Sequence, residues 1–522
     1  MSIRADDLPQ NVADLQALVR AQAARIEALE TSLKTLQAMI FAARSERKCV
    51  LLDSQMDLEL GDLADAAPPP PAANDDDPSQ TGGQRARKPA DRNVGRLPKW
   101  LERIDKIIEP DITACPCCAG ALHRIGEDIC EALDIVPAIL RVLRLIRPKY
   151  ACRACEDGVV QAPAPPRAQT GGMATTRLMA HVAVAKFAWN LPLNRQTQML
   201  AGQGIKLDRS TLSRWIKSVA WWTRPLYERQ LQVMHGFPRI FCDETRMPVR
   251  REDKKTVHIG QFWAHATDDR PWNGPAPPAV VYVYAEGRAH KEIRGQLAAF
   301  QGLVQVDGYA GYNGLTAKGR KPGPITLAFC LAHARRKFTD LHKKTGSAFT
   351  ADVIERFSRI YAIEAEIRGT SAAERRAVRQ ARSAPVMAAL KTVLEEELAG
   401  LSTKSKTAEA IRYVLGHWAG LTLFLEDGRL ETDTNTVERS MRTIALGRRN
   451  SLFAGDDGGA ESWAVLASLL NTCRLNEVDP FTWLDDVLER MVSGAVKAND
   501  LDQLLPWNWK AARAAQKQAI AA

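Results

Sequence analysis

Three acidic residues lie in contexts where carboxylates could bind divalent cations. Asp243 and Asp307 each follow a short apolar run, PRIFC and GLVQV, of the kind that forms a buried strand. Residues that end strands lie at the rim of a sheet, where two carboxylates can share metal ions. An aspartate in such a place is more often a turn residue, so neither position is convincing by itself.

The third acid, Glu438, lies in the segment TNTVERSMRTIALGRRN. Val437, Met441 and Ile444 follow helical spacing and should form the buried face of this helix. Glu438 then lies on the face next to it. A surface Glu–Arg pair is the simplest interpretation. Against it stands the density of basic residues around one acid, which suits phosphates that approach a metal-bound carboxylate. These basic residues are Arg439, Arg442, Arg448 and Arg449.

Two pairs of cysteines form a second candidate metal site. Cys115 and Cys118 are separated by two residues, as are Cys152 and Cys155, and 33 residues separate the pairs. Two such turns supply the four tetrahedral thiolates that zinc prefers, so the spacing predicts one structural zinc ion. Buried free cysteines, the alternative, would rarely repeat the same gap twice. Cys117, inside the first pair, is a competing ligand.

Five strand-like segments would position the acids. They follow Gly236 and read PRIFCDE, TVHIGQFWAHA, AVVYVYAE, GLVQVDGY and PITLAFC, which predicts a mixed α/β sheet. The 131 positions from Asp307 to Glu438 exceed what one strand and one helix require. Since residues 348–427 are helical in composition, we expect an all-helical insertion there.

Residues 173–234 have a helical pattern that breaks at AGQGIKLD. Two helices joined by a glycine-containing turn are typical of a helix-turn-helix. The second helix would offer Arg209, Arg214 and Lys217 to DNA. An ordinary helical hairpin fits the pattern nearly as well.

The N-terminal region predicts self-association. Apolar residues recur at alternating steps of three and four from Val12 to Ile40, with Gln22 as the one polar member of the series. This narrow stripe favours a coiled coil over an amphipathic helix packed on its own domain. Residues 65–84 are rich in Pro, Asp and Gly and should form a flexible linker. The basic residues from Arg85 to Lys99 fit either a phosphate-tracking segment or a solvated tether.

Bulk properties narrow the class of protein. A chain of 522 residues should hold roughly three to four modules. The net charge of +10 favours a polyanionic partner without identifying it. There is no uninterrupted apolar run of about 18 residues and no apolar signal-peptide core, so we expect a cytoplasmic protein without a membrane partner.

The order of four motifs resembles the insertion sequence 66 family of transposases. The motifs are CDET, VDGYAGYN, CLAHARRKF and NTVERSMRTIALGRRNSLFAG. The resemblance covers nearly the whole chain, from the zipper followed by ARSERK to the closing LLPWNW. It implies an Asp-Asp-Glu catalytic core of ribonuclease H type. In this family the matching catalytic acids are Asp243, Asp307 and Glu438, which would hold two magnesium or manganese ions.

The resemblance also bears on nearby residues. Glu244 neighbours the first acid, but the family's motif gives it no metal role, and strand alternation should point it away from the metals. Cys330 and His333 match a Cys-x-x-His signature of several such transposases and are expected to support the site structurally. Two departures concern partner contacts more than chemistry: FAARSER lacks a glycine often seen before the serine, and Thr434 stands where the family often has Asn.

The implied function is DNA transposition. Water would release 3′-hydroxyls at the element's ends, and these hydroxyls would attack target DNA in the same site. The expected partners are double-stranded DNA, as terminal inverted repeats and as target, and a second copy of the chain in a homodimer; a need for small accessory proteins stays open. A metal-dependent nuclease or resolvase and a DNA-binding regulator are the competing classes. The triad argues against the regulator, and the zipper with two DNA-binding modules argues against the nuclease.

The whole chain is therefore expected to be a multidomain α+β protein. Its expected parts are a coiled-coil region (1–64), a flexible basic linker (65–99), a zinc-binding module (100–166), a helical DNA-binding domain (167–235), a ribonuclease H-like α/β core with a helical insertion (236–470, insertion at about 348–427) and a C-terminal region (471–522).

Overall fold

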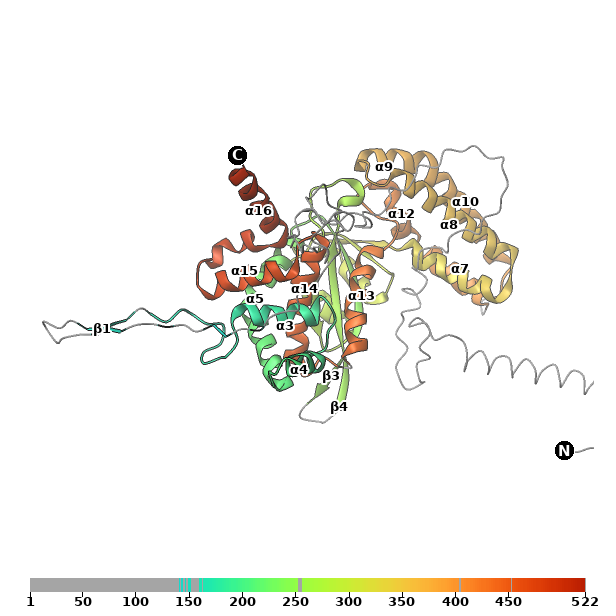
Figure 1. The fold of residues 1–522 in the computed structure, drawn as a ribbon. Coiled ribbons are helices and arrows are strands. Elements are labelled where there is room, and N and C mark those ends of the chain that lie inside the picture. The colour runs from blue at the N-terminus through green and yellow to red at the C-terminus, as the bar shows by residue number, and fades with distance from the viewer. Residues whose placement is uncertain are drawn as a thin grey trace, which may run out of the picture. The chain divides into compact units, whose positions relative to one another are not determined.

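The computed structural model describes residues 163–251, 256–402, 405–451 and 453–521, together with short pieces between 140 and 161 (Figure 1). The expected coiled coil, linker and four zinc-binding cysteines lie outside the described residues. Strands β1 (Lys149–Ala151) and β2 (Val159–Gln161) pair antiparallel. In the described part of the chain, no helix is both long enough and apolar enough to cross a bilayer.

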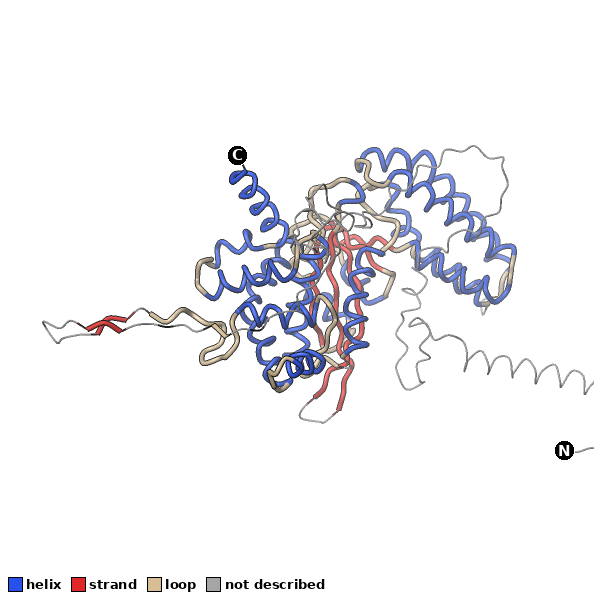
Figure 2. Tube along the Cα trace, viewed as in Figure 1, coloured by secondary structure: helices blue, strands red, loops and turns tan. Residues whose placement is uncertain are grey.

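All five expected strands are present and form one mixed sheet. They are β3 (Arg239–Arg251), β4 (Thr256–Thr267), β5 (Ala279–Ala285), β6 (Gly302–Val306) and β7 (Ile325–Phe329). Their order across the sheet is β5-β4-β3-β6-β7. The first three strands along the chain pair antiparallel, whereas β6 and β7 run parallel to β3. Figure 2 shows the strands side by side with helices alongside them.

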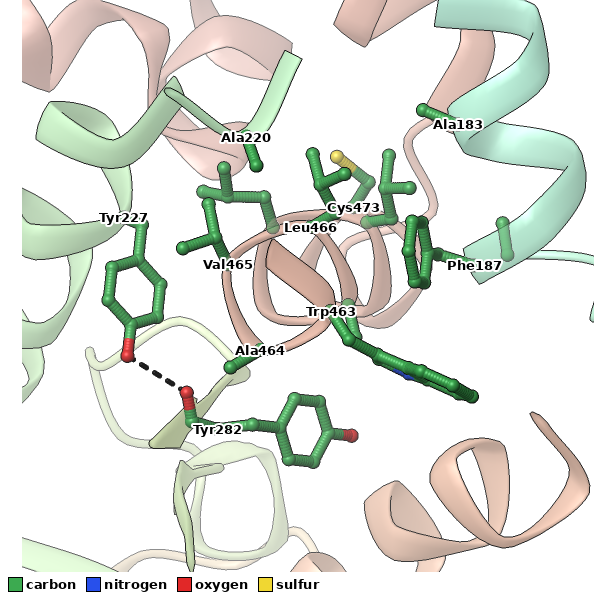
Figure 3. Close-up of a cluster of buried hydrophobic side chains, with 14 of the residues drawn as sticks. Ala183, Phe187, Ala220, Tyr227, Tyr282, Trp463, Ala464, Val465, Leu466 and Cys473 are labelled. Carbon is green, nitrogen blue, oxygen red and sulfur yellow. Dashed lines mark hydrogen bonds between the residues drawn. The ribbon is translucent and has the colours of Figure 1, made fainter. Parts of the chain in front are cut away.

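Helices from both ends of the described chain share one core with the sheet. These helices are α3 (Thr176–Phe187), α4 (Leu193–Gly202), α5 (Arg209–His235), α13 (Asn435–Asn450), α14 (Asp457–Leu475), α15 (Pro480–Val492), η5 (Ala498–Leu504) and α16 (Pro506–Ala521). In Figure 3, Phe187 of α3 and Tyr227 of α5 lie on either side of α14, which carries Trp463. Tyr227 donates a hydrogen bond of 2.9 Å to the backbone oxygen of Tyr282 in β5.

This shared core differs from the expected division at 235/236 and 470/471. One hydrophobic cluster joins residues of α3 and α5 with the sheet and with α14, α15 and η5. The physical reason is that α5 is far longer than a recognition helix needs to be: its 27 residues bury ten side chains, among them Trp215 and Leu226. The packing therefore unites three parts that composition alone separated.

Side chains of α14 also close the outer edge of the sheet. β5 is an edge strand, so one row of its backbone groups has no neighbouring strand. The hydroxyl of Thr472 accepts a hydrogen bond from Val280 N and donates one to Val280 O, both at 3.1 Å. Ser468 Oγ accepts from Tyr282 N at 2.8 Å. These hydroxyls occupy the place of a sixth strand.

The segment between the last strand and α13 is helical, as its composition predicted. It contains α7 (Leu331–Thr345), α8 (Ala348–Ile367), α9 (Ala372–Val378), the π-turn η4 (Arg379–Ser383), α10 (Ala384–Gly400), α11 (Lys406–Gly416) and α12 (Trp418–Glu426). These helices build a second core around Phe338, Phe357 and Leu390. Figure 1 shows α7 to α10 and α12 gathered in one group.

A third, smaller core lies on the face of the sheet opposite the core shared by α3, α5 and α14. It is covered by α6 (His290–Gln296) and η3 (Ala310–Thr316).

Candidate active site

Asp243 and Asp307 lie at the same level of two neighbouring parallel strands. β3 and β6 pair with Phe241 opposite Gln305. Two residues further along each chain stand Asp243 and Asp307, whose side chains follow the same alternation as that pair. Asp307 directly follows β6, as expected. The expectation that Asp243 also ends its strand is wrong, because β3 continues its pairing with β4 as far as Arg251.

Glu438 lies on α13, which packs against the face of the sheet that carries Phe241. It lies in the first turn of α13, whose apolar residues Val437, Met441 and Ile444 are buried as the spacing predicted. These residues share a core with Phe241, so α13 covers the face of β3 to which Phe241 and, by alternation, Asp243 belong. Glu438 Oε1 accepts a hydrogen bond of 2.7 Å from the hydroxyl of Thr434.

The three acids interact electrostatically. Burial raises the pKa of Asp243 well above its usual range, and the negative charges of Glu244, Asp307 and Glu438 raise it further. A hydrogen bond of 2.8 Å from Glu244 N to Asp243 Oδ1 opposes this effect. A set of oxygen donors that repel one another fits a hard divalent cation, which would offset their charge. Asp243, Asp307 and Glu438 are therefore the residues that could hold such ions.

The turn after β6 fixes the backbone at Asp307. Asp307 Oδ1 accepts a hydrogen bond of 2.8 Å from Tyr309 N. Tyr413, on α11 of the helical insertion, donates its hydroxyl proton to the backbone oxygen of Asp307 at 2.9 Å. Gly308, between Asp307 and Tyr309 in the sequence, has φ of +100°. A Cβ atom at this position would lie 2.6 Å from the Tyr413 hydroxyl. The close approach of Tyr413 thus requires glycine at this position.

Glu244 is engaged on the opposite face of β3. Its Oε1 accepts hydrogen bonds from Arg288, with Nε at 2.6 Å, and its Oε2 accepts one from the Tyr312 hydroxyl at 2.9 Å. The Arg288 guanidinium also lies over the ring of Tyr309, 3.8 Å from its centre. Burial raises the pKa of Glu244, while the charge of Arg288 lowers it in part. These partners agree with a side chain that alternation directs away from Asp243.

Cys330 and His333 lie beside Glu438. Cys330 directly precedes α7 and is buried, and its sulfur accepts a hydrogen bond of 3.4 Å from Thr434 N. His333 Nδ1 lies 3.9 Å from Glu438 Oε1. Burial lowers the pKa of His333, but a hydrogen bond with Cys330 and the charges of Cys330, Glu438 and Asp307 outweigh it and raise the pKa to about 10.

The basic residues expected to contact DNA have different surroundings. Arg439 and Arg449 on α13 are exposed, as are Arg209 and Arg214 near the start of α5, whereas Arg442 is half-buried. Lys217 is exposed but pairs with Asp456 at 2.8 Å. Arg448 is buried and donates to the backbone oxygen of Arg246. Its guanidinium is therefore directed into the fold, contrary to the expected phosphate contact, because its position on α13 faces β3.

Sequence reasoning missed four residues: Tyr413 and Thr434, which contact Asp307 and Glu438, and Arg288 and Tyr312, which bind Glu244 on the opposite face of β3. Tyr413 and Arg288 come from distant parts of the chain, and nothing in their local sequence marks them. Tyr312 lies within the quoted motif VDGYAGYN, but a motif does not say which of its residues bind one another. Thr434, four positions before Glu438, could have been found from helical spacing.

Four family models match the sequence. A model described as "Transposase IS66 family" matches residues 171–462, more than half of the chain. A "zinc-finger binding domain of transposase IS66" matches residues 113–156 and spans all four paired cysteines. An "IS66 C-terminal element" matches residues 468–507, and a "Transposase C of IS166 homeodomain" matches residues 28–105.

Relatives from Sinorhizobium fredii (strain NBRC 101917 / NGR234) extend over almost the full length. The protein y4jD is 52% identical over 518 residues, which cover 99% of this chain and 100% of the relative. The protein y4qI is 40% identical over 516 residues, covering 96% of this chain and 92% of the relative. Both are described as uncharacterized proteins.

Proposed function

Since this chain belongs to the IS66 family of transposases and is a DNA transposase, we propose that it cleaves the ends of its insertion sequence and joins them to target DNA through a two-metal site. Asp243, Asp307 and Glu438 are the proposed ligands. The competing regulator class does not account for these three acids.

The observation that carries this proposal is the convergence of three acids from distant parts of the chain. Asp243 comes from β3, Asp307 follows the parallel neighbour β6, and Glu438 comes from α13 on the same face. Burial raises the pKa of Asp243, and the negative charges of Asp307 and Glu438 raise it further. Burying like charges together costs free energy, so their placement supports a role in binding cations.

The chemistry of the site follows from these ligands. Divalent cations, when bound, activate the nucleophile and stabilise the leaving oxygen of a phosphodiester. Asp243, Asp307 and Glu438 would hold these ions, and no other residue is assigned as a ligand. Tyr309 N orients the Asp307 carboxylate and Thr434 orients Glu438. Water is the nucleophile in end cleavage, and the released 3′-hydroxyl is the nucleophile in strand transfer, so no covalent bond to the protein forms.

The fold of the core supports the same proposal. Three antiparallel strands followed by two strands parallel to the first, in the order β5-β4-β3-β6-β7, agree with a ribonuclease H-type sheet. In such an arrangement the first and fourth strands are neighbours, which is the relation between β3 and β6. We therefore propose a ribonuclease H-like catalytic core whose helical insertion lies between β7 and α13.

The remaining modules are proposed to bind zinc, DNA and a second chain. Cys115, Cys118, Cys152 and Cys155 would hold one structural zinc ion, which Cys118→Ser should release. The exposed basic side chains proposed to face DNA phosphates are Arg209, Arg214, Arg439 and Arg449. Zipper pairing of residues 12–40 in a dimer would let one assembly hold two DNA ends.

Three isosteric substitutions test the catalytic proposal. Asp243→Asn, Asp307→Asn and Glu438→Gln remove the charge that holds metal while keeping side-chain size. Each should lower cleavage and strand transfer, assayed in Mg²⁺ or Mn²⁺ on DNA carrying the element's own ends, by at least about 1,000-fold. Binding to that DNA, measured by gel shift, should stay nearly unchanged.

The control is Asp340→Asn, an exposed acid on α7 that pairs only weakly with Arg336 at 3.9 Å. It should retain wild-type activity. Joined products from all three triad variants would overturn the catalytic assignment. Cleavage without joining in the wild-type protein would instead favour a nuclease.

A further inference from the structure

A cysteine, a histidine and a glutamate gather where α7 meets α13, and the proposed transposition chemistry uses only the glutamate. Cys330 Sγ, a ring nitrogen of His333 and a carboxylate oxygen of Glu438 all lie within 4.8 Å of one another. Tetrahedral ligands with bond lengths of about 2.0–2.3 Å lie roughly 3.3–3.8 Å apart, so side-chain movements of up to about 1 Å would bring these donors to one ion. The cluster therefore has the dimensions of a metal site.

Local structure holds the three side chains together. Cys330 N donates to Val306 O at 3.1 Å, which fixes the residue between the sheet and α7. His333 follows three positions later and so lies on the same side of the first helical turn. Thr434 links the other two: its N–H donates to Cys330 Sγ at 3.4 Å, and its hydroxyl donates to Glu438 Oε1 at 2.7 Å. Such outer hydrogen bonds are typical of groups that orient metal ligands.

The donor types distinguish this cluster from the three carboxylates. Magnesium prefers hard oxygen ligands, whereas a thiolate, an imidazole and a carboxylate together suit zinc. We propose that Cys330, His333 and Glu438 bind a zinc ion distinct from the one assigned to the paired cysteines. Three protein ligands leave the fourth tetrahedral position to water.

A buried hydroxyl nearby supports this assignment. Tyr361 on α8 has a buried hydroxyl for which the described residues provide no hydrogen-bond partner. Burial raises the pKa of Tyr361 well above its usual value, and the negative charges of Cys330, Asp433 and Glu438 raise it further. An unpartnered buried hydroxyl is costly, and a zinc-bound water would give it a partner.

Sharing Glu438 makes this site inhibitory, a consequence that rests on the proposed function. A carboxylate engaged by zinc beside Cys330 and His333 is no longer available to complete the catalytic set with Asp243 and Asp307. Zinc should therefore slow DNA cleavage by competing for Glu438 rather than by replacing the catalytic ions.

Zinc binding is tested without any activity. The full chain, dialysed at a defined low free zinc concentration, should hold two zinc ions, and Cys330→Ala or His333→Asn should hold one. Loss of a ligand should weaken this site by more than roughly 100-fold, since even outer-sphere partners are worth about 10–100-fold in affinity. Cys118→Ser should also hold one ion, and the double variant Cys118→Ser with Cys330→Ala should hold none.

Matched controls separate ligation from folding. Cys473→Ala removes an equally buried free cysteine from α14, and His342→Asn changes another histidine of α7; both should keep two zinc ions. Circular dichroism should show native helix content for all variants. One zinc ion in both the wild-type chain and the Cys330→Ala chain would overturn the site.

Zinc inhibition is then measured as the ratio of cleavage rates with and without added zinc in excess Mg²⁺. The wild-type ratio should fall at least tenfold below that of Cys330→Ala and His333→Asn. Equal ratios would overturn the competition for Glu438 even if the zinc count holds. If the wild-type chain binds two zinc ions but shows no cleavage in excess Mg²⁺ even after the second zinc ion has been removed, the catalytic proposal fails while the zinc site stands.

Discussion

The hydroxyl of Tyr413 donates a hydrogen bond to the backbone oxygen of Asp307 across 2.9 Å. This bond joins α11 of the helical insertion to the turn that carries a proposed metal ligand. The ring of Tyr413 lies in turn beneath the ammonium group of Lys337 and beside His417. The insertion therefore contributes directly to the position of the Asp307 backbone.

Tyr413→Phe should raise the Mg²⁺ concentration needed for half-maximal DNA cleavage several-fold, because the Asp307 turn loses its outer restraint. The loss of one hydrogen bond should lower the free energy of unfolding by about 1 kcal/mol. Tyr227→Phe is the matched control, since Tyr227 also donates to a backbone oxygen at 2.9 Å but lies in the core of α5 and β5. It should show the stability loss alone; an equal Mg²⁺ effect in both variants would contradict the role of Tyr413.

Gly308→Ala should lower both stability and cleavage. Its φ of +100° strains any other residue by about 1–3 kcal/mol, and its new Cβ would in addition meet the Tyr413 hydroxyl. Gly204→Ala has a similar φ of +84° but nothing within 4 Å of its Cβ, so it should show the strain alone. Urea unfolding and cleavage rates measure the two effects. If both variants kept full cleavage, the close packing at Gly308 would be irrelevant to the site.

Acid should destabilise the fold through two histidines, the buried His265 and the half-buried His235. Burial lowers the pKa of His235 to about 3 and that of His265 to about 4, against about 6.5 in an unfolded chain. Both rings stay neutral in the fold, so their stabilising contribution is complete above about pH 6.5. It is lost as the pH falls towards 4, at up to about 1.4 kcal/mol per pH unit for each ring.

Urea unfolding at pH 7, 6 and 5 measures this loss. His235→Gln should lower the slope of the free energy of unfolding against pH by the contribution of one ring. A wild-type free energy of unfolding that is flat over this range would show that the two rings already bind protons in the fold.

Glu364 should be essential to the helical insertion. It accepts hydrogen bonds from the two buried arginines Arg375 and Arg379, at 3.3 and 2.7 Å to one oxygen. Glu364→Gln would leave the buried Arg379 without its carboxylate partner, whereas Arg375 keeps Glu431 at 2.7 Å, and should cost about 3–5 kcal/mol. Glu366→Gln, two residues away, breaks only the exposed pair with Arg382 and should change stability little. Hydrogen exchange in α8 and α9 should rise in the first variant alone.

The sequence predicted the five strands because a short apolar run marks each of them. The parallel pairing of β3 and β6 then brings Asp243 and Asp307 to one level. The helical spacing around Glu438 likewise decides which face of α13 is buried.

Other features depend on contacts that no local pattern reveals. The bond from Tyr413 to Asp307 spans 106 residues, and the buried position of Arg448 follows from how α13 lies on β3. Composition placed domain boundaries on either side of the sheet, whereas the core joins α3 and α5 to α14. Amphipathic faces indicate that a helix packs, but not against which partner.

The hydrogen bonds between α14 and β5 can form only after α14 has been synthesised. Thr472 lies 192 residues after Val280, so the edge strand leaves the ribosome long before the hydroxyls that cover it. Until then the unpaired backbone groups of β5 can form hydrogen bonds with a strand of another chain. A chain ending at Asp456 should therefore sediment as aggregate, and a soluble, folded fragment of that length would contradict this dependence. Gene copies truncated before α14 would then leave no stable protein to compete with the intact transposase for DNA ends.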